Sequence, residues 1–198
     1  MAKKENQSAS EFQYLEKLYK RVFGGKCGYQ RWGKNTEEAK LGATGSLWEI
    51  NKFATLGRSQ INISEKFMND DLPYMQLEIY KDGGEEGWSV ADDEIEYYFF
   101  IGQKYAYKVR SCWIYGLALR IQDFLDEDQK IKQWLDKINK SGTKQVKFIT
   151  KFGVPSLPTE IEIELKCERG GNGLKILANV DWKQCMGKLK MDIERIKL

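Results

Sequence analysis

"MQLEIYKDGGEEGWSVADDEIEYYFFI", residues 75–101, decides how this chain folds, because it joins two apolar stretches through a glycine-rich bend full of carboxylates. Residues 74–80 and 96–102 are rich in aromatic and β-branched side chains, which predicts two β-strands. Ser89 or Asp92 could start a short helix between them. The acidic bend is then either part of a divalent-metal site or the solvated rim of a sheet.

The pattern outside this stretch predicts a mixture of helices and strands. Residues 8–23 have apolar side chains on one helical face, and Gly24 and Gly25 end that helix. The same reading gives strands at 47–53, 59–67, 103–109, 143–152, 159–169 and 174–180, and helices at 111–125 and 126–142. Residues 26–46 are expected to be mostly irregular. An amphipathic C-terminal helix is predicted from an apolar stripe in residues 181–198: Trp182, Met186, Leu189, Ile193 and Ile196.

Composition limits the chemistry more than it limits the fold. The chain of 198 residues has no histidine, which excludes Ser-His-Asp and Cys-His catalysis. Its four cysteines form no CxxC pair, so zinc-ribbon spacing is absent. No apolar run approaches the roughly 18 residues that a spanning helix needs, and the first residues contain no apolar signal region. We therefore expect a cytoplasmic protein with no membrane partner.

Charge is nearly balanced overall, with 32 basic and 29 acidic residues and a formal net charge of +3. Residues 17–40, however, interleave basic and aromatic side chains, a mixture that suits phosphate contacts beside stacking rings. A helix end followed by a solvated basic loop would have the same composition. The candidate nucleic-acid-binding residues are Lys20, Arg21, Lys26, Tyr29, Arg31, Trp32 and Lys34.

The element order over residues 10–125, together with "MQLEIYKDGGEEGWSVADDEIEYYFFIGQKYAYKV", resembles nucleases of the PD-(D/E)xK, or restriction-endonuclease-like, superfamily in its phage-type members. The resemblance covers roughly residues 45–120. It implies an α+β or α/β fold with a central mixed sheet flanked by helices. We expect a nuclease-like core at residues 1–125 and a C-terminal extension of helix and β-hairpin at 126–198, packed on the same core.

In that superfamily two carboxylates hold Mg²⁺ beside a lysine, so the resemblance assigns catalytic roles to Glu49, Lys66 and Glu78, and metal ligation to Glu49, Glu78 and Asp71. The sequence departs from the pattern because Ser64 stands where the acid of the (D/E)xK motif belongs. A literal ExK motif occurs at 164–166, where Glu164 and Lys166 form a second candidate site or an ordinary half-exposed strand.

These observations favour a nuclease-like fold with weakened or lost catalysis that binds nucleic acid or a partner protein complex, as a phage-type accessory factor would. One alternative is an active Mg²⁺-dependent nuclease with a rearranged acidic site. Another is a protein-interaction module without enzymatic activity. The C-terminal stripe could also join two copies of the chain as a homodimer.

Overall fold

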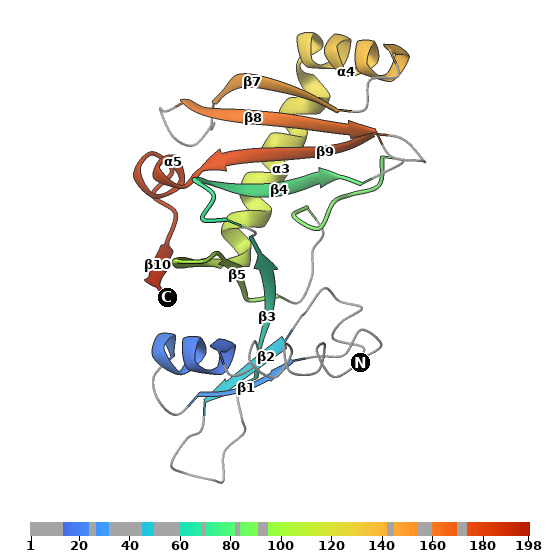
Figure 1. The fold of residues 1–198 in the computed structure, drawn as a ribbon. Coiled ribbons are helices and arrows are strands. Elements are labelled where there is room, and N and C mark those ends of the chain that lie inside the picture. Colours follow the sequence, from blue (N-terminus) through green and yellow to red (C-terminus); the bar gives the residue numbers. More distant parts are fainter. Residues whose placement is uncertain are drawn as a thin grey trace. The chain divides into compact units, whose positions relative to one another are not determined.

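The computed structural model describes residues 14–23, 27–31, 45–49, 60–68, 70–81, 84–90, 95–141, 145–153, 160–169 and 174–198. These residues form a mixed α+β structure with two multi-stranded sheets and four helices (Figure 1). The chain divides into two compact units. Unit 1 comprises Met1–Asp70, Asp93–Lys108 and Arg195–Leu198, and unit 2 comprises Asp71–Asp92 and Val109–Glu194. This division does not follow the predicted boundary at residue 125.

The six-stranded sheet belongs to unit 1 except at the ends of its last two strands. Its order is β1-β2-β3-β5-β6-β10. The strands are β1 (Cys27–Arg31), β2 (Gly45–Glu49), β3 (Gln60–Phe67), β5 (Tyr97–Ile101), β6 (Tyr105–Arg110) and β10 (Ile193–Lys197). A helix at 14–22 packs on it, because Leu15, Leu18 and Tyr19 are buried with Ile63 and Phe99 in one apolar cluster. The two N-terminal strands lie partly in a region that was expected to be irregular.

Strand β3 pairs with β5 in parallel, with Ile63 opposite Tyr97 and Phe67 opposite Ile101. Parallel neighbours need a crossover connection. In this chain the crossover contains β4 (Tyr74–Tyr80), which pairs in the other sheet. The two apolar stretches of residues 75–101 therefore lie in different sheets, and the single central sheet that was expected is replaced by two.

The four-stranded sheet of unit 2 is antiparallel, in the order β4-β9-β8-β7. Its other strands are β7 (Gln145–Gly153), β8 (Glu160–Arg169) and β9 (Leu174–Asp181), and its helices are α3 (Ser111–Glu127) and α4 (Gln129–Ser141). Alternate residues of β4 are buried, and α3 runs behind the sheet and contacts β4 (Figure 1). One sheet face therefore forms the core with α3, and side chains on the other face form the polar network described below.

Residues 84–90 lie along the end of β4. The Gly87 N–H donates to the Ile79 carbonyl (2.8 Å), and the Ser89 hydroxyl donates to the Glu78 carbonyl (2.5 Å). Trp88, Ser89 and Val90 form a turn. The predicted short helix is thus not formed at 89–90 or 95–97, and its residues 91–94 lie outside the described part.

The C-terminal helix prediction is wrong beyond residue 187. Helix α5 (Trp182–Gly187) begins at Asp181, whose carboxylate accepts hydrogen bonds from the backbone N–H groups of Lys183 and Gln184. Lys190 then adopts a left-handed conformation (φ 51°), and the chain continues as β10. The apolar stripe therefore divides between a short helix and a strand, with Ile196 joining the core of unit 1. The proposed homodimer through a C-terminal helix loses its structural basis.

Candidate functional site

The strand register separates Glu49 from Lys66. Trp48, the residue before Glu49, pairs with Gln60 at the start of β3, and Lys66 lies six residues further along that strand. At about 3.3 Å per residue this is roughly 20 Å. Glu49, at the end of β2, therefore lies beside the start of β3, while Lys66 lies near the other end of β3, too far away for one cation to bind both at ordinary ligand distances.

Glu78 lies on β4, in the four-stranded sheet, so no strand pairing brings it next to Lys66. Its carboxylate pairs with the Lys175 ammonium at 2.6 Å, and its side chain is 14% exposed. Asp71 precedes β4 in the same unit. The sheet pairings therefore do not assemble Glu49, Lys66 and Glu78 on one face, as the resemblance implied.

Among the residues that the structure describes, no group of three or more cysteine, aspartate or glutamate side chains is arranged to hold a metal ion. The described carboxylates of the acidic bend, those of Glu85, Glu86 and Glu96, are exposed. For these three residues, the interpretation as the solvated rim of a sheet fits better than the interpretation as ligands of a metal ion. Asp82 and residues 92–94 lie outside the described residues.

A carboxylate outside the predicted set of site residues is buried in unit 1. Glu65 is 6% exposed, and its Oε1 accepts hydrogen bonds from the hydroxyls of Tyr19 (2.6 Å) and Tyr29 (2.8 Å). Tyr19 comes from the helix at 14–22 and Tyr29 from β1, so the carboxylate links three elements. The sequence could have indicated this burial, because Ile61, Ile63 and Glu65 stand at alternate positions and therefore lie on the same face of β3.

Of the predicted nucleic-acid-binding residues, Lys20 and Arg21 lie exposed on the helix at 14–22. The Lys20 ammonium pairs with Glu16 at 2.7 Å, and Arg21 donates to the Lys197 carbonyl at 2.8 Å. Tyr29 is buried, 7% exposed, so its ring is not available for stacking on a base. Lys26, Trp32 and Lys34 lie outside the described residues, as does the side chain of Arg31.

A basic and aromatic cluster that was not predicted lies beside this helix. The Lys108 ammonium, on β6, is 4.6 Å from the ring centroid of Phe23 and 4.8 Å from that of Tyr97. The two rings also pack on each other with centroids 6.1 Å apart. We call Lys108, Phe23 and Tyr97 the cation–aromatic cluster. The alternation in "QKYAYKV" indicates only that Lys108 shares a strand face with Ala106. It could not predict the contacts with Phe23 and Tyr97, because these rings come from other segments of the chain.

Two further basic side chains of unit 1 stack on tyrosine rings. Arg195 lies 3.8 Å from the ring centroid of Tyr105, and the Lys66 ammonium lies 5.6 Å from that of Tyr98. Cation–π contacts of this kind help to hold a cation in a defined place. Lys66 on β3 therefore contacts a ring of the neighbouring strand β5.

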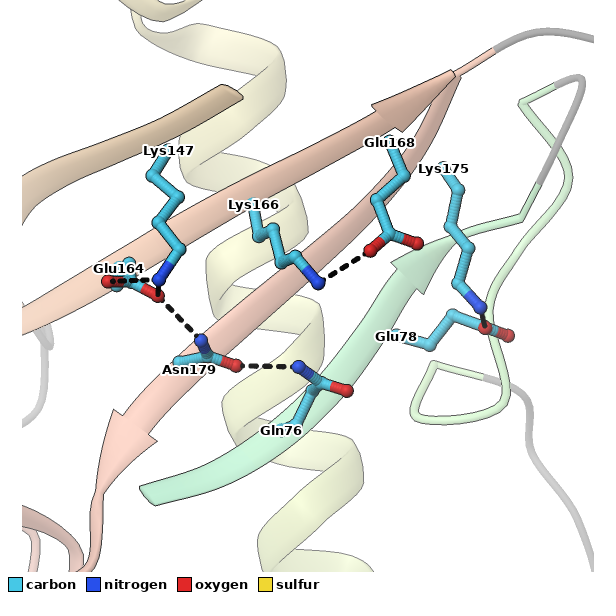
Figure 2. A network of polar contacts seen from close by, with 8 residues as sticks. All are labelled: Gln76, Glu78, Lys147, Glu164, Lys166, Glu168, Lys175 and Asn179. Atoms are coloured by element: carbon cyan, nitrogen blue, oxygen red, sulfur yellow. Dashed lines mark hydrogen bonds and ion pairs between the residues drawn. The ribbon is translucent and has the colours of Figure 1, made fainter. Parts of the chain in front are cut away.

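The outer face of the four-stranded sheet carries a network of polar contacts (Figure 2). Gln76 donates to Asn179 (3.0 Å), Asn179 donates to Glu164 (2.8 Å), and the Lys147 ammonium lies 3.3 Å from the same carboxylate. These four residues come from β4, β9, β8 and β7 in turn, so the chain of contacts crosses the whole sheet.

The literal ExK motif is part of this network. Glu164 contacts Asn179 and Lys147, while Lys166 pairs with Glu168 at 2.6 Å. Its neighbours Ile163 and Leu165 are buried, as alternation along a half-exposed strand requires. The motif therefore has the surroundings of an ordinary sheet surface.

Burial makes two cysteines of unit 2 unreactive at neutral pH. It raises the pKa of the Cys167 thiol to about 12 and that of Cys185 also to about 12. Burial, with a hydrogen bond to the Asp126 carboxylate, raises the pKa of Tyr80 to about 12. Since the thiolate is the reactive form of cysteine, neither buried thiol is a candidate nucleophile.

Comparison with protein-family models, with curated proteins and with solved structures gave no match to this chain. None of the helices in the described residues combines the length and apolar character needed to cross a membrane.

Proposed function

We propose that the protein binds nucleic acid through unit 1, without cutting it. The observation that carries the proposal is the cation–aromatic cluster, in which the Lys108 ammonium is held between two partly exposed rings. A phosphate can pair with this cation while a base lies against a neighbouring ring. From the predicted set, Lys20 and Arg21 lie on the helix that immediately precedes Phe23.

The distribution of charge between the units supports the same conclusion. Unit 1 contains 16 lysines and arginines but 11 aspartates and glutamates, a net charge of +5. Unit 2 contains 16 lysines and arginines and 18 aspartates and glutamates, a net charge of −2. The nearly neutral total therefore hides a basic unit, and a polyanion is attracted to unit 1 rather than to unit 2.

The strand register makes the active-nuclease alternative the weaker one, because about 20 Å of β3 separates Glu49 from Lys66. The relation to the restriction-endonuclease-like superfamily stays a proposal, and binding without hydrolysis does not require it. Incubation of plasmid and single-stranded DNA with Mg²⁺ or Mn²⁺ tests the alternative directly. If the unmodified protein cleaves DNA and both Lys66→Ala and Glu78→Ala lose this activity, the protein is a nuclease and the proposal of binding without cleavage is wrong.

The binding proposal is tested by fluorescence anisotropy with labelled single-stranded and duplex DNA and RNA over a range of salt concentrations. We expect affinity to fall steeply with salt because bound counterions are released. Lys108→Met keeps the aliphatic stem on the rings but removes the charge, so it should reduce the slope of log K against log salt by about one.

The matched control is Lys130→Gln, which removes an exposed lysine from α4 in unit 2. It should leave both the affinity and the salt slope unchanged. If the two variants behave alike, or if the unmodified protein binds none of the probes at low salt, unit 1 is not a nucleic-acid-binding surface.

A further inference from the structure

Strand β7 forms an edge of the four-stranded sheet (Figure 1). All nine of its residues, Gln145 to Gly153, pair with β8 without a register shift. Within the described part of the chain, no strand pairs with its other side. Alternate residues of an antiparallel edge strand direct their N–H and C=O groups away from the partner, so β7 offers a row of backbone donors and acceptors.

The side chains of β7 give this edge a chemical character. Lys147, Ile149 and Lys151 are exposed on the outer face, and Ile149 is 62% exposed, the most exposed large apolar side chain among the described residues. On the opposite face, the Phe148 ring packs against Trp134 of α4 with centroids 4.9 Å apart. The packing holds the strand from one side while an apolar residue flanked by two cations faces outward.

The neighbouring strand β8 already shows which partner suits these side chains. Glu162 lies opposite Lys151, and Glu164 lies opposite Ile149 with its carboxylate 3.3 Å from the Lys147 ammonium. Lys166 lies directly opposite Lys147, whose ammonium is instead met by Glu164 on the diagonal. Carboxylates of β8 therefore lie close to both lysines of β7. By charge complementarity, a strand added to the other side would place carboxylates near both lysines and an apolar side chain near Ile149.

A second copy of the chain fits this edge less well. Antiparallel pairing of two β7 strands about Ile149 would put Lys147 of one copy opposite Lys151 of the other. Parallel pairing in register would put each lysine opposite itself. Like charges directly opposite each other destabilise a strand pair, so the lysines disfavour self-association through β7.

We propose that the open edge of β7 binds an extended acidic segment of a partner protein by strand addition, with one carboxylate two residues before and another two residues after an apolar residue. Backbone hydrogen bonds would supply much of the affinity, and Lys147, Ile149 and Lys151 would select the sequence. This interaction surface lies in unit 2 and does not depend on the binding of nucleic acid by unit 1.

The test uses the full chain and a capped, fluorescent peptide of the length of β7, with Glu, Val and Glu at its third, fifth and seventh positions and Thr at the others, so that the two Glu and the Val share one face. We expect saturable binding that weakens about tenfold in Lys147→Gln/Lys151→Gln and in Ile149→Ser. Two further peptides are tested on the unmodified protein: one has Lys in place of Glu, and one has alternate backbone nitrogens methylated. Both should fail to bind, because one reverses the charge and the other lacks the N–H donors.

Lys130→Gln/Lys132→Gln on α4 is the matched control and should bind as the unmodified protein does. The proposal is overturned if the acidic peptide does not bind, or if the basic or methylated peptide binds equally well. If the acidic peptide does not bind, sedimentation of Lys147→Gln/Lys151→Gln shows what the lysines do instead, because this variant should then form dimers. In that case the lysines only guard the edge against self-association.

Discussion

Glu65 shows how one residue connects three elements of unit 1. A carboxylate that is removed from water is costly unless it is hydrogen-bonded, and two tyrosine hydroxyls donate to the same oxygen of Glu65. The Tyr19 ring also packs on Tyr29 and Phe99, with centroids 4.8 Å and 4.9 Å away. The tyrosines therefore serve the core both as apolar surface and as hydrogen-bond donors.

Removing either hydroxyl should destabilise the protein. We expect Tyr19→Phe and Tyr29→Phe each to lower the free energy of unfolding by about 1.5–3 kcal/mol, the usual range for a hydrogen bond to a charged group. The double variant should lose more than the two losses combined, since it takes both donors from one oxygen. Urea unfolding followed by tryptophan fluorescence measures all three.

Tyr115→Phe is the control, because Tyr115 is half-buried and its hydroxyl bonds to no other described residue. Its free energy of unfolding should stay within about 0.5 kcal/mol of that of the unmodified protein. Losses at Tyr19 and Tyr29 as small as this would mean that the hydrogen bonds to Glu65 contribute nothing.

At the scale of elements, the segment 84–90 fixes the outer edge of β4. Gly87 approaches β4 so closely that a Cβ there would lie 1.9 Å from the Glu78 carbonyl oxygen. Glycine is required at this position by the close approach of two backbones. The segment can follow β4 this closely because no side chain intervenes.

Gly87→Ala should therefore separate this segment from β4 and break the bond from its N–H to the Ile79 carbonyl. We expect a loss of about 1–3 kcal/mol in the free energy of unfolding, as for other overpacked sites. Gly116→Ala in α3 is the opposite case, since nothing lies within 4 Å of its Cβ position. It should stabilise the protein by about 0.5–1 kcal/mol, because alanine is the better helix former. Chemical denaturation measures the free energy of unfolding of both variants. Equal changes in this free energy would contradict the close approach of the two backbones at Gly87.

At the scale of the whole molecule, three groups of the described residues have clearly raised pKa values, and all three belong to unit 2: Tyr80, Cys167 and Cys185. Each has a higher pKa in the folded protein than its ordinary value of 9.0 for cysteine or 10.0 for tyrosine. The folded state therefore holds these protons more tightly than the unfolded state. Their contribution to stability is complete below pH 9 and is lost as the pH rises towards 12.

We accordingly expect the free energy of unfolding to decline above pH 9, measured by urea titration at a series of pH values. In Cys167→Ala/Cys185→Ala the decline should be shallower, whatever the double substitution does to stability at pH 7. The exposed Cys112 provides the control, since Cys112→Ala should leave the decline intact. An unchanged slope in the double variant would show that the buried thiols do not cause the decline.

The sequence by itself determined most of the local structure. Aromatic and β-branched composition predicted β4 and β5, and alternation predicted β8. The helical spacing of Ile131, Trp134 and Ile138 predicted α4, because a helix that buries one face repeats its apolar residues with the helical period. The apolar stripe in residues 181–198 gave a wrong prediction. Trp182, Leu189 and Ile196 have the spacing of one helix, but Trp182 is buried on α5 and Ile196 on β10.

Only the tertiary structure decided which strands are neighbours, and with them the candidate sites. Nothing local distinguishes a β4 that pairs with β3 from one that pairs with β9, because either pairing satisfies the same alternation. The choice depends on contacts between residues far apart in the chain, such as Gln76 with Asn179 or Tyr19 with Glu65. The same long-range pairing separated Glu49 from Lys66, gathered Phe23, Tyr97 and Lys108, and left β7 at an edge.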